Sequence, residues 1–173
     1  MKKVIFIILG ILGLTALCWA NPQETEELMR EAQGAAQAGE TNLAFIYYHT
    51  IWQNDPESVY KDQVLFALGE YYYLTSNYDE AERFFRQYLL QAEDSSGAIF
   101  ARAYLFKFAE MKNDREAMGQ FIGEILGSRQ HTFTFRSHKE DQFHSPLGQT
   151  HKAVYAIDQV KFYSEGDLIV TVF

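Results

Sequence analysis

The sequence predicts a mainly helical protein built from repeated helix pairs and followed by a small C-terminal antiparallel β element. Over residues 62–88, apolar residues recur at helical spacing, stop at 75–77, and then recur at helical spacing again. That pattern is typical of two antiparallel helices joined by a tight turn. After Gly127, apolar residues alternate with polar ones, as they do in half-buried strands. We therefore expect three helix-turn-helix units over 21–128 and a β-rich element over 129–173.

The central unit has small residues where its two helices would have to approach closely. Gly69 lies in the first helix, Ala81 lies in the second, and Phe85 supplies the bulk beside them. This pattern resembles the tetratricopeptide repeat (TPR), which asks for Leu-Gly, an aromatic, an alanine and a second aromatic at these intervals. The matching residues are Leu68, Gly69, Tyr72, Tyr78, Ala81 and Phe85. Two hallmarks differ, because Leu65 stands at the family's tryptophan and Glu93 at its closing proline.

Two further units flank the central one. Helix pairs are expected over 24–53 and 98–126, with turns at 39–42 and 111–114. Alanines at equivalent places in the three second helices recur at nearly the ~34-residue period of the family; they are Ala44, Ala81 and Ala117. Three units are about the minimum with which stacking buries a continuous core. The resemblance thus implies an α-solenoid.

The C-terminal part has strand-like composition in several short segments, which are 131–136, 152–157, 159–163 and 168–173. The polar stretch 137–150 is expected to be a loop, and 164–167, which contains Gly166, a hairpin turn. A small sheet with one exposed apolar face is not stable alone. We therefore expect the sheet to pack on the last helix pair and to cover the end of the array.

The N-terminus predicts a secretory signal peptide over residues 1–20. Two lysines precede an uncharged apolar run that ends in small residues at Cys18 and Ala20, which favours cleavage after Ala20. Retention as a membrane anchor is one alternative, although the run is shorter than the ~20 residues that span a bilayer. Lipidation is another, although the large Leu17 precedes Cys18. Cleavage would leave no cysteine and no disulfide, and we expect the bacterial periplasm.

The chain is acidic, with a formal net charge of −8, and the excess of acidic residues lies in the helical part. Nucleic-acid binding is not expected, because it needs a basic face. Binding to an anionic membrane surface is disfavoured for the same reason, so membrane contact is expected only through a retained N-terminal segment or a lipidated Cys18. The acidic excess keeps a protein soluble or steers a basic partner towards it.

In TPR arrays the first helices of successive repeats line a concave groove, so the resemblance implies that a protein or peptide partner binds there. Rigid aromatics and arginine carry most of the hot-spot energy at interfaces. Glu70 and Glu110 would select basic residues of the partner. The groove residues expected from helical spacing are Met29, Gln33, Phe66, Glu70, Tyr73, Arg102, Phe106 and Glu110. The alternative is that Phe66 and Phe106 pack between neighbouring helices.

Catalytic or metal chemistry finds little support in the sequence. Four of the five histidines fall within 131–151, and they are His131, His138, His144 and His151. Carboxylates lie beside them in the sequence, and imidazole and carboxylate groups are both common metal ligands. The spacing of these histidines matches no compact ligand motif, so a metal or ligand site there is an alternative. No Gly-x-Ser-x-Gly motif or phosphate-binding loop occurs. We expect a non-catalytic, cofactor-free scaffold of the cell envelope, with self-association as a further alternative.

Overall fold

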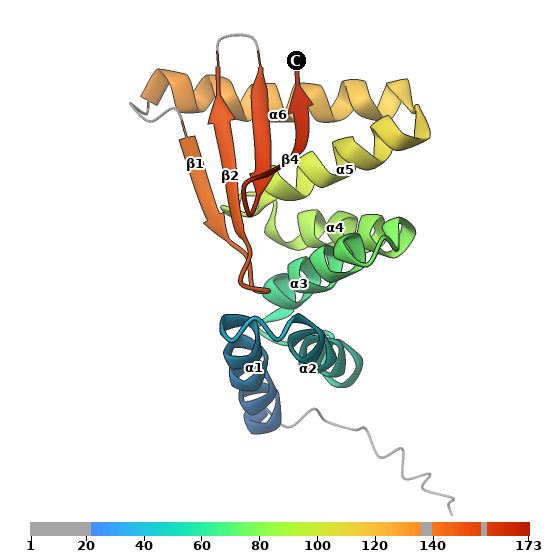
Figure 1. Ribbon diagram of the computed structural model, residues 1–173, viewed down its shortest axis with the longest axis vertical. Coiled ribbons are helices and arrows are strands. Elements are labelled where there is room, and N and C mark those ends of the chain that lie inside the picture. The colour runs from blue at the N-terminus through green and yellow to red at the C-terminus, as the bar shows by residue number, and fades with distance from the viewer. Residues whose placement is uncertain (1–21, 136–139, 157–158) are drawn as a thin grey trace, which may run out of the picture.

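The computed structural model describes residues 22–135, 140–156 and 159–173, with the main chain alone over 128–135. Within these ranges, helices come first and a single four-stranded sheet follows (Figure 1). The helices are α1 (Pro22–Gln37), α2 (Thr41–Asn54), α3 (Lys61–Leu74), α4 (Tyr78–Ala92), α5 (Ala98–Lys112) and α6 (Arg115–Phe135). The strands are β1 (Glu140–His144), β2 (Thr150–Tyr155), β3 (Val160–Ser164) and β4 (Asp167–Val172). The prediction of a mainly helical chain with a small antiparallel sheet is confirmed.

Each helix packs against the next one in the chain (Figure 1). Where α3 meets α4, a Cβ atom added to Gly69 would lie 3.1 Å from the ring of Phe85, which is fully buried together with Ala81. The small residue therefore sets how closely the two helices approach. Residues at equivalent places in the first pair are also fully buried, namely Ala32, Ala44 and Tyr48.

The last helix is longer than the sequence predicts. α6 continues through Gly127 and includes 131–135, so the predicted strand over 131–136 is wrong for the residues that the structure describes. Extending an existing helix requires no new nucleus, and a glycine inside it costs only about 1 kcal/mol. The short alternating pattern around Phe133 and Phe135 favours a strand less strongly than the preceding turns of α6 favour continuing the helix.

The sheet is antiparallel with the order β1-β2-β3-β4. Strands β2 to β4 lie within two residues of their predicted positions, whereas β1 falls in the stretch 137–150 that was predicted to be a loop. That prediction is wrong at 140–144 because β1 is an edge strand with alternate residues exposed, so it needs few apolar side chains. The predicted hairpin turn is confirmed, since Glu165 and Gly166 have φ of 48° and 90°.

One face of the sheet shares a single core with the helices. Its buried side chains lie in the same cluster as those of α3 and α5, and they are Ala153, Tyr155, Val160, Phe162, Val170 and Val172. The sheet does pack on α5, as expected. It also reaches the earlier helix pairs, because the Tyr48 hydroxyl in α2 donates a hydrogen bond of 2.8 Å to the carbonyl of Pro146. The sheet thus lies alongside the helices and does more than cover the end of the array.

Across the ranges that the structure describes, none of the helices has both the length and the apolar character needed to cross a membrane. The predicted signal peptide and Cys18 lie outside the described residues.

The α3–α4 contact gives a test of packing. We expect Gly69→Val to lower the free energy of unfolding by about 1–3 kcal/mol, because the added side chain would press on the Phe85 ring. The matched control is Gly34→Ala in α1, where an added Cβ meets no atom within 4 Å, and a small gain of up to about 1 kcal/mol is expected. Urea unfolding of both variants measures the difference, and equal effects would contradict the packing argument.

Candidate functional site

The face formed by α3 and α5 is occupied by the chain's own sheet. Phe66, in α3, has no exposed surface, and its ring centroid lies 4.9 Å from that of Phe143 in β1 and 5.9 Å from that of His151 in β2. Glu70, one turn further along α3, is likewise fully buried. A partner therefore has no access to the centre of this face in the structure.

Glu70 joins the helices to the sheet through two hydrogen-bonding partners. Its Oε2 accepts a bond of 2.5 Å from the Ser145 hydroxyl, and its Oε1 lies 2.5 Å from Nε2 of His151. All three residues are buried. A buried carboxylate is costly unless its oxygens are hydrogen-bonded, and here both are. Rings surround the imidazole at centroid distances of 5.5 to 6.0 Å; they belong to Phe66, Phe100, Tyr104 and Phe143.

Nε2 of His151 is placed to donate a hydrogen bond to the Glu70 carboxylate. His151 Nδ1 is buried and has no hydrogen-bond partner among the described residues. An unpaired acceptor there is tolerated better than an unpaired N–H donor, so the proton is assigned to Nε2. Burial raises the pKa of the Tyr48 and Tyr104 hydroxyls, and the nearby charge of Glu70 raises both further.

The trio of serine, histidine and carboxylate is not arranged for nucleophilic catalysis. In that arrangement the histidine bridges the serine and the carboxylate. Here the carboxylate of Glu70 lies between Ser145 and His151, and all three residues are buried. These contacts hold the sheet on the helices. The expectation that the protein is non-catalytic stays a prediction.

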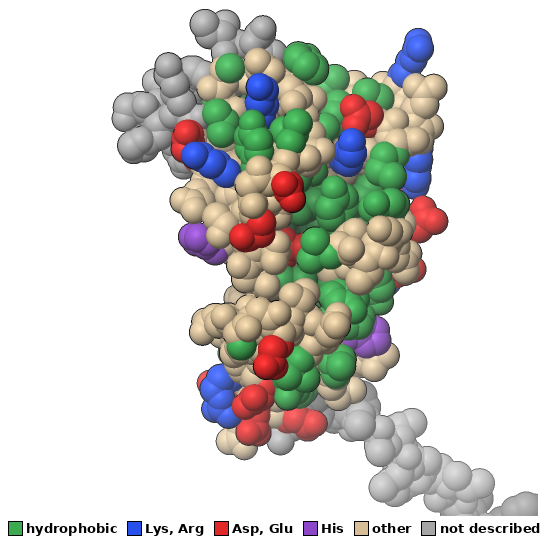
Figure 2. Space-filling model, in the orientation of Figure 1, with side chains coloured by type: hydrophobic (Ala, Val, Ile, Leu, Met, Phe, Trp, Pro, Cys, Tyr) green, Lys and Arg blue, Asp and Glu red, His purple; other side chains and the backbone are tan. Residues whose placement is uncertain are grey.

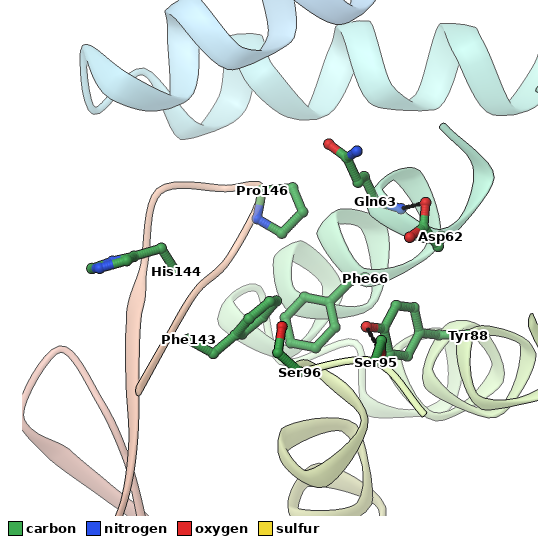
Figure 3. Close-up of a pocket in the computed structure, with 9 residues that line it drawn as sticks. All are labelled: Asp62, Gln63, Phe66, Tyr88, Ser95, Ser96, Phe143, His144 and Pro146. Atoms are coloured by element: carbon green, nitrogen blue, oxygen red, sulfur yellow. Dashed lines mark hydrogen bonds between the residues drawn. The ribbon is translucent and has the colours of Figure 1, made fainter. Parts of the chain in front are cut away.

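A pocket of about 240 Å³ remains open beside this buried cluster, between α3, the loop after α4 and the β1–β2 hairpin (Figure 3). The rings of Phe66, Tyr88 and Phe143 lie next to one another in it, whereas the ring of His144 points away from them (Figure 3). Tyr88 and Ser95 share a hydrogen bond of 2.6 Å. The other lining residues are Asp62, Gln63, Ser96 and Pro146.

A second surface lies where the α3–α4 turn meets the end of α5. We call it the turn edge and define it by Phe45, Tyr71, Tyr72, Tyr73, Leu74, Tyr78 and Met111. Phe45 stacks on Tyr71 at 3.8 Å, and Tyr73 lies 5.8 Å from Tyr78. Leu74 and Met111 are 48% and 51% exposed. In Figure 2, hydrophobic side chains gather over α3 to α5 at the right of the view.

The predicted groove residues do not form one open surface. Met29, Phe66, Glu70 and Phe106 are buried, and Arg102 is 9% exposed and bound to Glu124 at 2.9 Å. Gln33, Tyr73 and Glu110 reach solvent, at separate places in α1, α3 and α5. The groove expectation therefore needs correcting at its centre. α3 and α5 carry buried apolar residues on nearly every side, because the sheet covers the face that would otherwise contact water.

The two described histidines of this region do not lie together as the ligands of a metal site would. His144 is exposed and lies 3.3 Å from the Thr150 hydroxyl, whereas His151 is buried against Glu70. His138 and the side chain of His131 lie outside the described residues. Among the residues that are described, no group of three or more His, Cys, Asp or Glu could hold a metal ion.

Sequence reasoning missed the partners of Glu70, although two signals pointed to them. Glu70 follows a run of buried residues in α3, where a lone carboxylate needs a donor. His151 alternates with Ala153 and Tyr155, which places all three on one face of β2. Comparison with known proteins adds no family, since no family model matches the chain and no curated protein matches it either.

The buried pair can be tested by a double-mutant cycle. We expect Glu70→Ala and His151→Ala each to lower the free energy of unfolding by about 3–5 kcal/mol, because each leaves a buried polar group unpaired. The double variant should lose clearly less than the sum, since neither partner is then left behind. Arg83→Ala, which breaks an exposed pair with Glu80, should cost at most about 1 kcal/mol. Additive losses in urea unfolding would show that the two side chains do not act together.

Proposed function

We propose that this chain is a non-catalytic TPR-type binding module or scaffold of the bacterial cell envelope, and that it binds a protein partner at the turn edge. The repeat assignment is supported by small buried residues at equivalent places in successive helix pairs, which are Ala32 and Ala44, then Gly69 and Ala81. Successive packing of α1 to α6 also fits stacked helix pairs.

The observation that carries the proposal is the exposed apolar surface of the turn edge. Leu74 and Met111 project from among half-buried tyrosines, and a hollow of about 320 Å³ lies beside them, lined by Tyr78 and Lys112 among others. Tyrosine and methionine are enriched at protein interfaces. With the centre of the α3–α5 face filled by the sheet, the turn edge is the better place for a partner.

The location in the envelope rests on the sequence alone, through the predicted signal peptide over 1–20. The alternative of a metal or ligand site over 131–151 gains no support from His151, whose Nε2 is occupied by Glu70 in the interior. Self-association would use an exposed apolar surface of the same kind, so the partner at the turn edge could be a second copy. Light scattering over a range of concentrations separates that case from a different partner.

Photo-crosslinking in the native envelope tests the proposed surface. A photoreactive amino acid at Leu74 should give one discrete adduct, because this side chain is half exposed within the turn edge. The matched control replaces Leu90, a leucine that is 81% exposed at the far end of α4 and outside the turn edge. It should give no such adduct. Equal adducts from both sites, or none from Leu74, would contradict the proposal.

The same surface can be weakened at Tyr73, a partly buried residue whose ring also lies 4.7 Å from that of the buried Tyr104. We expect Tyr73→Ala to reduce the Leu74 adduct by about tenfold, since truncating an interface hot spot commonly costs more than 1 kcal/mol. Gln33→Ala, which changes an exposed side chain in α1, should leave the adduct unchanged.

A further inference from the structure

The pocket of Figure 3 carries a negative charge and no positive one. Its lining includes a single carboxylate, Asp62, and neither a lysine nor an arginine. One oxygen of Asp62 accepts a bond of 2.8 Å from the backbone N–H of Gln63 (Figure 3). Burial raises the pKa of the Tyr88 hydroxyl, the hydrogen bond with Ser95 lowers it in part, and the charge of Asp62 adds a smaller rise. The field of Asp62 therefore reaches the aromatic floor of the pocket.

Of the three rings in that floor, Phe143 is partly exposed and can face a cation, whereas Phe66 and Tyr88 are buried. The ring of Phe66 lies 5.2 Å from that of Tyr88 and 4.9 Å from that of Phe143, in both cases edge to face. Aromatic faces attract an ammonium or guanidinium group within about 6 Å of the ring centroid. The hydroxyl of Ser96 and the amide of Gln63, which also line the pocket, offer further acceptors.

The size of the pocket indicates what can enter. Its volume of about 240 Å³ is below the ~300–1,000 Å³ of ordinary small-molecule sites. A single long side chain fits that space better than a cofactor does. The first turn of α3 opposes a cation through its dipole, but a helix N-terminus carries only about half a charge. The full charge of Asp62 outweighs it.

We propose that this pocket receives the side chain of a lysine or arginine from the protein partner. The proposal rests on the partner-binding function given above and adds that the partner must present a basic side chain. Charge complementarity extends beyond the pocket, because the helical part of the chain is acidic overall. A basic segment would thus be attracted to the array before its side chain enters the pocket.

Binding of a probe cation to the full chain tests the pocket directly. The probe is N-acetyl-lysine N-methylamide, and its control is the norleucine analogue, in which a hydrogen replaces the ammonium group. Amide chemical shifts of Gln63, Ser95 and Ser96 should move and saturate with the lysine probe, at a Kd of about 1–10 mM. The norleucine analogue should bind at least about tenfold more weakly.

Three variants assign that binding to Asp62. Asp62→Asn should weaken the lysine probe by about tenfold, and Asp62→Glu should retain most of the affinity because it keeps the charge. Asp79→Asn is the matched control: Asp79 occupies the same place in the first turn of α4, is exposed and lies outside this pocket. No saturation, equal binding of norleucine, or equal losses in the two asparagine variants would overturn the proposal.

The two proposals fail separately. The probe experiment needs no partner, so a negative result leaves an adduct at Leu74 as evidence for the turn edge. Conversely, saturable and Asp62-dependent probe binding without any adduct at Leu74 would support the pocket and reject the turn edge as the partner surface.

Discussion

The carboxylate of Glu70, removed from water in the middle of α3, is the constraint on which the rest of the structure depends. Its two oxygens need donors, and among the residues that the structure describes Ser145 and His151 supply them, from the far end of the sequence. These contacts fix the register of the sheet on the helices. A slip of one residue in β2 would turn His151 outward and bring Lys152 into an aromatic interior. Few alternative placements of the sheet can therefore compete.

The placement of the sheet also determines which surfaces remain for a partner. The β1–β2 hairpin lies against Phe66 and extends to the Tyr48 hydroxyl, so the face of α3 and α5 becomes part of the core. The carboxylate of Glu70 is hydrogen-bonded inside the protein, whereas that of Asp62, two turns earlier, lies beside an open pocket. One helix thus presents one acidic side chain to the interior and another to a cavity.

The helix pairs could be predicted because each is encoded locally. Gly69, Ala81 and Phe85 are close in the chain, and the contact between them follows from helical spacing. The length of α6 and the existence of β1 could not be read in this way. Whether 131–135 continues a helix depends on the turns before it, and β1 is stabilised by pairing with β2. The composition of β1 itself is mostly polar and does not predict a strand.

The candidate site was predictable only in part, for the same reason. Tyr73 was identified from its position in α3 and does reach solvent. The exposure of Phe66 and Glu70 was expected because their helix resembles one that lines a groove, and no local pattern shows that a distant sheet fills that space. The pocket beside Asp62 brings together α3, the loop after α4 and the β1–β2 hairpin. A site assembled from such distant segments emerges only with the tertiary structure.

The hydrogen bond between Tyr48 and Pro146 has a consequence for how the chain folds. It spans 98 residues, and the contact between Glu70 and His151 spans 81. Helical repeat arrays are usually sums of neighbouring units that fold through short-range contacts. In this chain, α2 and α3 also contact the β1–β2 hairpin, which is synthesised well after them. We therefore expect the N-terminal helices and the sheet to unfold together and not as separate units.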